Sequence, residues 1–88
     1  MRRITLELYG IARRRAGTDR VTVDADTLSE ALLALERACP ALAGEVVTAG
    51  RLAPHWRASL DGGRFLDATN EVLPPDARIV ILSGLAGG

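Results

Sequence analysis

The sequence contains no lysine, and its eleven basic side chains are all arginine. The chain therefore offers no ε-amino group that could accept an acyl group. A single cysteine, Cys39, excludes an internal disulfide framework. Cys39 and the single histidine, His55, supply too few ligands for a zinc site, which needs four protein ligands or three plus water. We therefore expect no bound metal.

Aromatic residues and long apolar runs are scarce as well. Only Tyr9, Trp56 and Phe65 are aromatic, so the core must be mostly aliphatic. No apolar run approaches the roughly 20 residues of a membrane span. The first eight residues alternate polar and apolar side chains, where a signal peptide would be continuously apolar.

Acids and bases balance at zero net charge, without the basic excess typical of nucleic-acid binding. We expect a cytoplasmic protein that binds neither membrane nor nucleic acid.

No catalytic set is recognisable, so we do not expect an enzyme in its own right. Cys39, at a helix end before Pro40, fits a small buried apolar residue, because a catalytic thiol needs a helix N-terminus or a basic neighbour. His55 falls on an expected strand without a nearby nucleophile and fits a surface or interface residue. The run at 13–15 is the only dense basic spot. It fits a solvated turn, with a patch for an acidic partner as the alternative.

Alternating apolar and polar residues predict strands, and glycine and proline mark the turns between them. The connection over 10–20 is expected to be a turn with at most one helical turn. Residues 40–54 should form a short helical turn and then a loop. Hairpin or turn residues follow at 61–63 and 73–76. The expected strands cover residues 3–9, 20–24, 55–60, 64–66 and 78–82.

One amphipathic helix is predicted after the second strand. Thr27-Leu28-Ser29-Glu30 is a capping box, in which the threonine hydroxyl and the glutamate carboxylate bond each other's backbone amides. Pro40 should end the helix at about Cys39, because the residue before a proline avoids the α region. An apolar stripe at helical spacing follows the cap, made of Leu28, Ala31, Leu32, Leu35 and Ala38.

These elements predict an α+β fold with one main helix on one face of a mixed sheet. If the first and last strands are parallel neighbours, the fold is a ubiquitin-like β-grasp. We expect a single domain over 1–88 with a tail over 83–88. The expected core between helix and sheet consists of Leu6, Leu8, Val21, Val23, Leu28, Leu32, Leu35, Ile79 and Ile81.

The tail carries the strongest functional signal. Gly87-Gly88 gives a free carboxylate with no side chain for two residues, which can enter a channel too narrow for a Cβ atom. A carboxylate is inert at neutral pH, but after adenylation by ATP it is a mixed anhydride that accepts a nucleophile, including sulfur. Such a terminus suits a carrier. A frayed glycine terminus is the alternative.

The last strand is apolar on both faces, unlike the first. Ile79 and Ile81 point one way, while Val80 and Leu82 point the other. If the first pair meets the helix, the second lies on the open face beside the tail, where an apolar patch usually marks a binding site. Alternatively, a homodimer or the segment 40–54 covers these residues.

The sequence resembles the ubiquitin-related sulfur carriers typified by the molybdopterin synthase small subunit and the thiamine-pathway carrier. The resemblance spans nearly the whole chain: residues 4–10, Ala16-Gly17, Thr27-Leu28, 39–42 and, most specifically, 79–88. In that family the terminal glycine is adenylated and converted to a thiocarboxylate. The resemblance implies that Gly88 carries the sulfur and that the residues before it thread the partner's channel, namely Gly84, Leu85, Ala86 and Gly87.

The resemblance also implies the partners. These are a ubiquitin-activating-like adenylyltransferase and a sulfur-acceptor synthase of the molybdopterin synthase large-subunit type. ATP would be used by the activating partner, with no cofactor bound to the chain itself. The length favours molybdopterin synthesis, and cysteine, thiamine, tRNA or natural-product thiolation stay open. A ubiquitin-like protein modifier and an inert β-grasp interaction domain are the other two hypotheses.

Overall fold

The structure is a computed structural model that describes residues 2–61, 63–66 and 69–83. The elements follow the expected order, with additions at 10–16 and 47–52. Their bounds are β1 (Arg2–Leu8), α1 (Gly10–Ala16), β2 (Arg20–Ala25), α2 (Leu28–Ala38), a 3₁₀ turn η1 (Pro40–Leu42), β3 (Val47–Thr48), β4 (Arg51–Leu52), β5 (Trp56–Leu60), β6 (Arg64–Leu66) and β7 (Arg78–Ser83).

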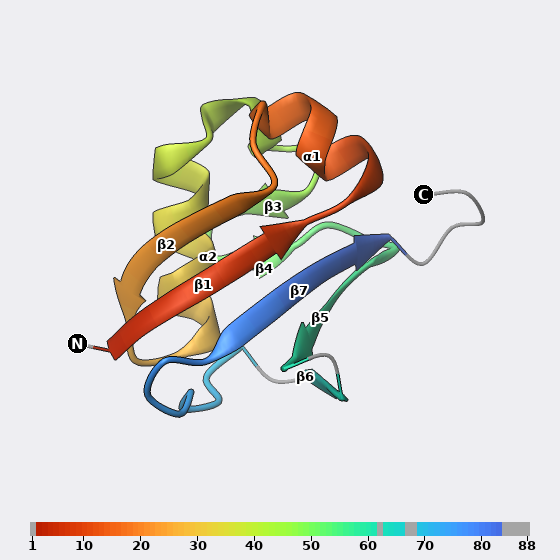
Figure 1. Cartoon of the computed structure of the whole chain (residues 1–88). Coiled ribbons are helices and arrows are strands. Elements are labelled where there is room, and N and C mark those ends of the chain that lie inside the picture. The colour runs from red at the N-terminus through yellow and green to blue at the C-terminus, as the bar shows by residue number, and fades with distance from the viewer. Residues whose placement is uncertain (1, 62, 67–68, 84–88) are drawn as a thin grey trace.

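The main sheet has the strand order β2-β1-β7-β5-β6. β1 and β7 are parallel neighbours, with Leu6 opposite Ile79 and Leu8 opposite Ile81, whereas the other pairs are antiparallel. Figure 1 views the sheet from its helix-free face, with α2 lying behind it. The expected α+β, ubiquitin-like β-grasp is confirmed.

The capping box of α2 forms as predicted. The Glu30 amide donates to the Thr27 hydroxyl over 3.2 Å, and the Glu30 carboxylate accepts from the amides of Thr27 at 3.1 Å and Asp26 at 2.8 Å. The next two free amides are also satisfied, because Leu28 donates to the carbonyl of Glu71 and Ser29 to that of Thr69. The start of α2 is thus held both by its own cap and by the segment that leads into β7.

The expected core is largely confirmed. Val21 and Val23 are only half-buried, because β2 is an edge strand of the sheet. Ala38 is exposed, and Cys39, one helical turn after Leu35, is buried in its place. The expected residues found fully or almost fully buried are Leu6, Leu8, Leu28, Leu32, Leu35, Ile79 and Ile81.

Two connecting segments contain more structure than expected. Residues 10–16 form the helix α1 rather than a turn, because Ala12 packs into the core and Gly17 closes the helix in the left-handed conformation with φ 75°. After the expected short helical turn, η1, the supposed loop contains the hairpin β3–β4. β5 begins at Trp56, so His55, at φ 74°, precedes the strand instead of opening it.

The β3–β4 hairpin lies close against α2. At Gly50, with φ 79°, an added Cβ atom would come within 2.8 Å of the Ser29 hydroxyl oxygen and 3.1 Å of Leu33 Cγ. The hairpin therefore covers the outer side of α2. Neither helix in the described part of the chain is long and apolar enough to cross a membrane.

Candidate functional site

The central strand of the sheet leads to the end of the sequence. β7 lies between β1 and β5 and ends at Ser83. Because β1 runs parallel to β7, both finish at one end of the sheet, at Leu8 and Ser83, which we call the tail end. The tail residues expected to carry or thread the thiocarboxylate lie outside the described residues: Gly84, Leu85, Ala86, Gly87 and Gly88.

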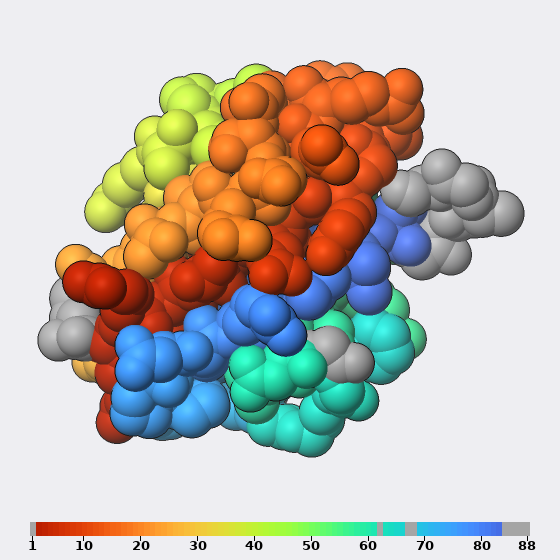
Figure 2. Space-filling view, viewed as in Figure 1, coloured from red at the N-terminus to blue at the C-terminus, as the bar shows by residue number. Residues whose placement is uncertain are grey.

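Val80 and Leu82 point to the helix-free face of the sheet, as expected. Their neighbours on β7, Ile79 and Ile81, are fully buried on the helix side. Both outward residues are half-buried, because the neighbouring strands screen them. Figure 2 shows this face in space-filling form, and no helix crosses it. The β7 faces were thus assigned correctly from the sequence.

Phe65 extends this surface, which the sequence analysis missed. Ser59 on β5 lies opposite both Val80 and Phe65, so the three form one cross-strand row. Phe65 is 44% exposed, and the Arg57 guanidinium carbon lies 4.0 Å from its ring centroid. We call Val80, Leu82 and Phe65 the apolar patch. The sequence showed only that Phe65 alternates with Arg64 and Leu66 on a short strand, which does not settle which face it takes.

The segment 40–54 does not cover the apolar patch. The turn η1 contacts α1 and α2, and both short strands of the hairpin contact α2. This places the segment on the helix side of the sheet. The suggestion that it buries Val80 and Leu82 was therefore wrong, and of the two alternatives named from the sequence only the homodimer is left.

The titratable residues assemble no catalytic set in the described ranges. Cys39 is buried as expected, and burial raises the pKa of its thiol, which keeps it protonated and unreactive near neutral pH. His55 is exposed just before β5. In those ranges, no three His, Cys, Asp or Glu side chains gather closely enough to hold a metal ion.

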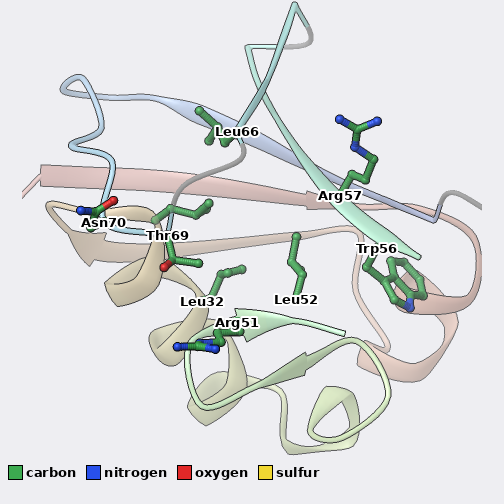
Figure 3. A pocket seen from close by; sticks show the side chains of 9 residues that line it. Leu32, Arg51, Leu52, Trp56, Arg57, Leu66, Thr69 and Asn70 are labelled. Atoms are coloured by element: carbon green, nitrogen blue, oxygen red, sulfur yellow. The ribbon is translucent and has the colours of Figure 1, made fainter. Parts of the chain in front are cut away.

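A cleft of about 540 Å³ opens on the helix side, between α2, β4, β5 and the side chains of Leu66, Thr69 and Asn70. Leu32 from α2 and Leu52 from β4 point into it in Figure 3, whereas Arg57 points away across the sheet. The described lining contains no carboxylate, imidazole or thiol, so it has no group for acid–base or nucleophilic chemistry. Its residues are Leu28, Leu32, Arg51, Leu52, Trp56, Arg57, Leu66, Thr69 and Asn70.

No protein-family model matches the sequence, and no curated protein matches it. Several solved structures are similar to this chain. The crystal structure of small archaeal modifier protein 1 from Haloferax volcanii matches at 27% identity and a TM-score of 0.81, over 98% of this chain and 99% of that one. Two further matches show the fold alone. The modifier protein 1 of Methanosarcina acetivorans has 22% identity, a TM-score of 0.80 and 100% and 98% coverage. A putative molybdopterin converting factor subunit 1 from Pyrococcus furiosus has 10% identity, a TM-score of 0.77 and 97% and 100% coverage.

These similarities agree with the geometry of the site. The matched Haloferax protein is a small modifier protein that aligns with this chain over almost the full length of both. The parallel β1–β7 pair and the mixed five-stranded sheet agree with the β-grasp folds of the matched proteins. The chain has a ubiquitin-like β-grasp fold, and its fold and matches fit the MoaD/ThiS-like, ubiquitin-related family.

Proposed function

We propose that the chain is a cytoplasmic sulfur carrier whose C-terminal Gly88 is adenylated and then converted to a thiocarboxylate. The observation that carries this proposal is the course of β7. This central strand ends at Ser83, only residues 84–88 separate it from the end of the given sequence, and that end is Gly87-Gly88. In this proposal, the residue that carries the sulfur follows the central strand of the sheet by only five positions.

The proposed chemistry needs two steps. The Gly88 carboxylate attacks the α-phosphorus of ATP, and pyrophosphate leaves, which gives an acyl adenylate. A hydrosulfide equivalent then attacks the acyl carbon, the bond to the AMP oxygen breaks, and AMP leaves with the thiocarboxylate formed. The sulfur is not oxidised or reduced. Both steps belong to an adenylating partner enzyme, which holds the ATP, so the chain itself needs no cofactor.

The apolar patch is the proposed docking surface for that enzyme and for the sulfur acceptor. Val80 and Leu82 are the last two residues of β7 that face the open side before Ser83. A partner bound to them would therefore lie next to the point where the tail begins. Docking there shortens the distance over which the tail must search for the active site. Molybdopterin synthesis, through a synthase large subunit, is the acceptor reaction that we propose first.

Mass spectrometry tests the proposal. The purified chain is incubated with ATP, its adenylating enzyme and a sulfide donor, and the C-terminal peptide is analysed. Replacement of one terminal oxygen by sulfur supports the carrier. An unchanged terminus, with an enzyme shown to be active, would leave an inert interaction domain.

A protein modifier is the second candidate, because the matched Haloferax protein is named as one. In that case the Gly88 carboxyl group would be joined to amino groups of other proteins. Since the 88 residues contain no lysine, a second copy could not be attached to a side-chain amine of the first. Isopeptide-linked partners in the same mass-spectrometric experiment would select this function.

A further inference from the structure

The arginine cluster Arg13-Arg14-Arg15 is the largest surface feature without a role in the proposed function. The three residues form the last turn of α1 and are all exposed. α1 starts directly after β1 and contacts β7, which places it at the tail end of the sheet (Figure 1). The cluster thus lies at the same end of the molecule as the start of the tail.

Few carboxylates balance this cluster. Arg15 reaches Glu45 over 3.7 Å, whereas Arg13 and Arg14 form no ion pair within the ranges 2–61, 63–66 and 69–83. Asp19 lines the same shallow depression as these two arginines, which leaves one carboxylate beside two guanidinium groups. The negative C-terminal end of α1 favours cations there, but it does not neutralise groups that face solvent.

The opposite end of the sheet is different. Arg2 lies 3.6 Å from Asp26 and Arg78 lies 3.6 Å from Glu7, while Arg3 lines one depression together with Asp24, Asp61 and Asp76. These three carboxylates gather near the start of β7. Beside α1, by contrast, the three arginines are accompanied by only Glu45 and Asp19, which leaves a local excess of positive side chains at the tail end.

Exposed apolar side chains precede the cluster in the sequence. Tyr9 follows Leu8, and its hydroxyl donates over 3.3 Å to the carboxylate of Glu7, the residue that lies opposite Val80. Tyr9 is 49% exposed and Ile11, in the first turn of α1, is 43% exposed. The arginines therefore belong to the same segment as these exposed apolar side chains, at the end of the sheet that also carries Leu82.

We propose that Arg13 and Arg14 contact an acidic protein surface beside the catalytic cleft of the adenylating enzyme. This rests on the proposed function and adds the direction of docking. An apolar patch alone permits several rotations of the domain, whereas a cation pair on one flank selects the rotation in which the tail end faces the cleft. A nucleic acid is disfavoured as the occupant, because the cluster stands alone in a chain without net charge.

The test is the association rate of the full chain with its adenylating enzyme, measured by stopped flow at about 0.05 M and about 0.5 M salt, where charges are weakly and strongly screened. The Arg13→Gln/Arg14→Gln variant should associate about threefold or more slowly at low salt, and the difference should shrink at high salt. The matched control, Arg37→Gln/Arg51→Gln, removes the same charge from two exposed residues on the helix side and should associate like the wild type.

Equal rates for wild type and Arg13→Gln/Arg14→Gln would overturn the proposal. So would an equal loss in both double variants, since net charge alone would then explain it. Sulfur loading of the wild type separates this failure from a failure of the proposed function. If the wild type loads and the arginine variants behave alike, only the docking direction is wrong. If the wild type neither binds nor loads, both proposals fall.

Discussion

Val80 of β7 lies opposite Glu7 of β1 in parallel register, and this pair places Val80 in the middle of the open face. Val80→Asp or Leu82→Asp should weaken binding to the adenylating enzyme by about tenfold or more, because a charge would be buried in an apolar contact. Isothermal titration calorimetry measures the affinity, and circular dichroism checks that the domain stays folded. Unchanged affinity in a folded variant would place the docking surface elsewhere.

Leu32 lies in the middle of the buried face of α2 and is fully inaccessible to solvent. Leu32→Ala should lower the free energy of unfolding by about 2–5 kcal/mol, from lost burial and the cavity left behind. Urea denaturation measures this change. Arg37→Ala, at an exposed position of the same helix, is the control and should stay within about 0.5 kcal/mol of the wild type. A small effect of Leu32→Ala would contradict the assigned helix face.

Gly50 and Gly44 form a matched pair for the packing of the β3–β4 hairpin on α2. Both have positive φ, 79° and 83°, so alanine costs about 1–2 kcal/mol of backbone energy at either. Only at Gly50 would the new Cβ atom also crowd Ser29 and Leu33, whereas it meets no heavy atom within 4 Å at Gly44. Thermal unfolding should therefore show a clearly larger loss for Gly50→Ala. Equal losses would mean that the hairpin does not press on the helix.

The Arg64–Glu71 ion pair predicts a pH dependence of stability. Arg64 Nη2 lies 2.5 Å from Glu71 Oε2, and this hydrogen bond lowers the pKa of Glu71 from its ordinary value of 4.5. The pair therefore stabilises the fold fully above pH 4.5 and loses this contribution as the pH falls through the folded-state pKa. Denaturation from pH 7 downward should show wild type and Glu71→Gln converging below that value. A difference independent of pH would contradict this account.

Elements marked by several independent residues were predicted from the sequence, whereas elements marked by one or two residues were not. In α2, the Thr27–Glu30 cap and four buried apolar positions all indicate the same helix. This helix was predicted with its correct bounds. α1 has only seven residues and a Tyr9 cap without a side-chain hydrogen bond, so its formation depends on Ala12 packing into a core that only the folded chain provides. The same holds for β3–β4, whose two-residue strands are held against α2.

The candidate site was predicted in part for similar reasons. Period-two alternation correctly assigned Val80 and Leu82 to the open face. Phe65 could not be added, because its place beside Ser59 depends on the β5–β6 register across a turn. The position of the arginine cluster at the tail end also depends on a long-range fact, the parallel pairing of the first and last strands. Pairing between strands that are distant in sequence is decided by the whole fold.

The central claim is that the terminal glycine accepts sulfur. The most direct measurement compares the mass of the C-terminal peptide of the wild type with that of a variant lacking Gly88, after reaction with ATP, the adenylating enzyme and a sulfide donor. The wild type should exchange one oxygen for sulfur, and the variant should not, while both unfold at nearly the same temperature because the deletion lies beyond the last strand. Sulfur gained by the shortened variant, or by neither protein with an enzyme of proven activity, would contradict the account.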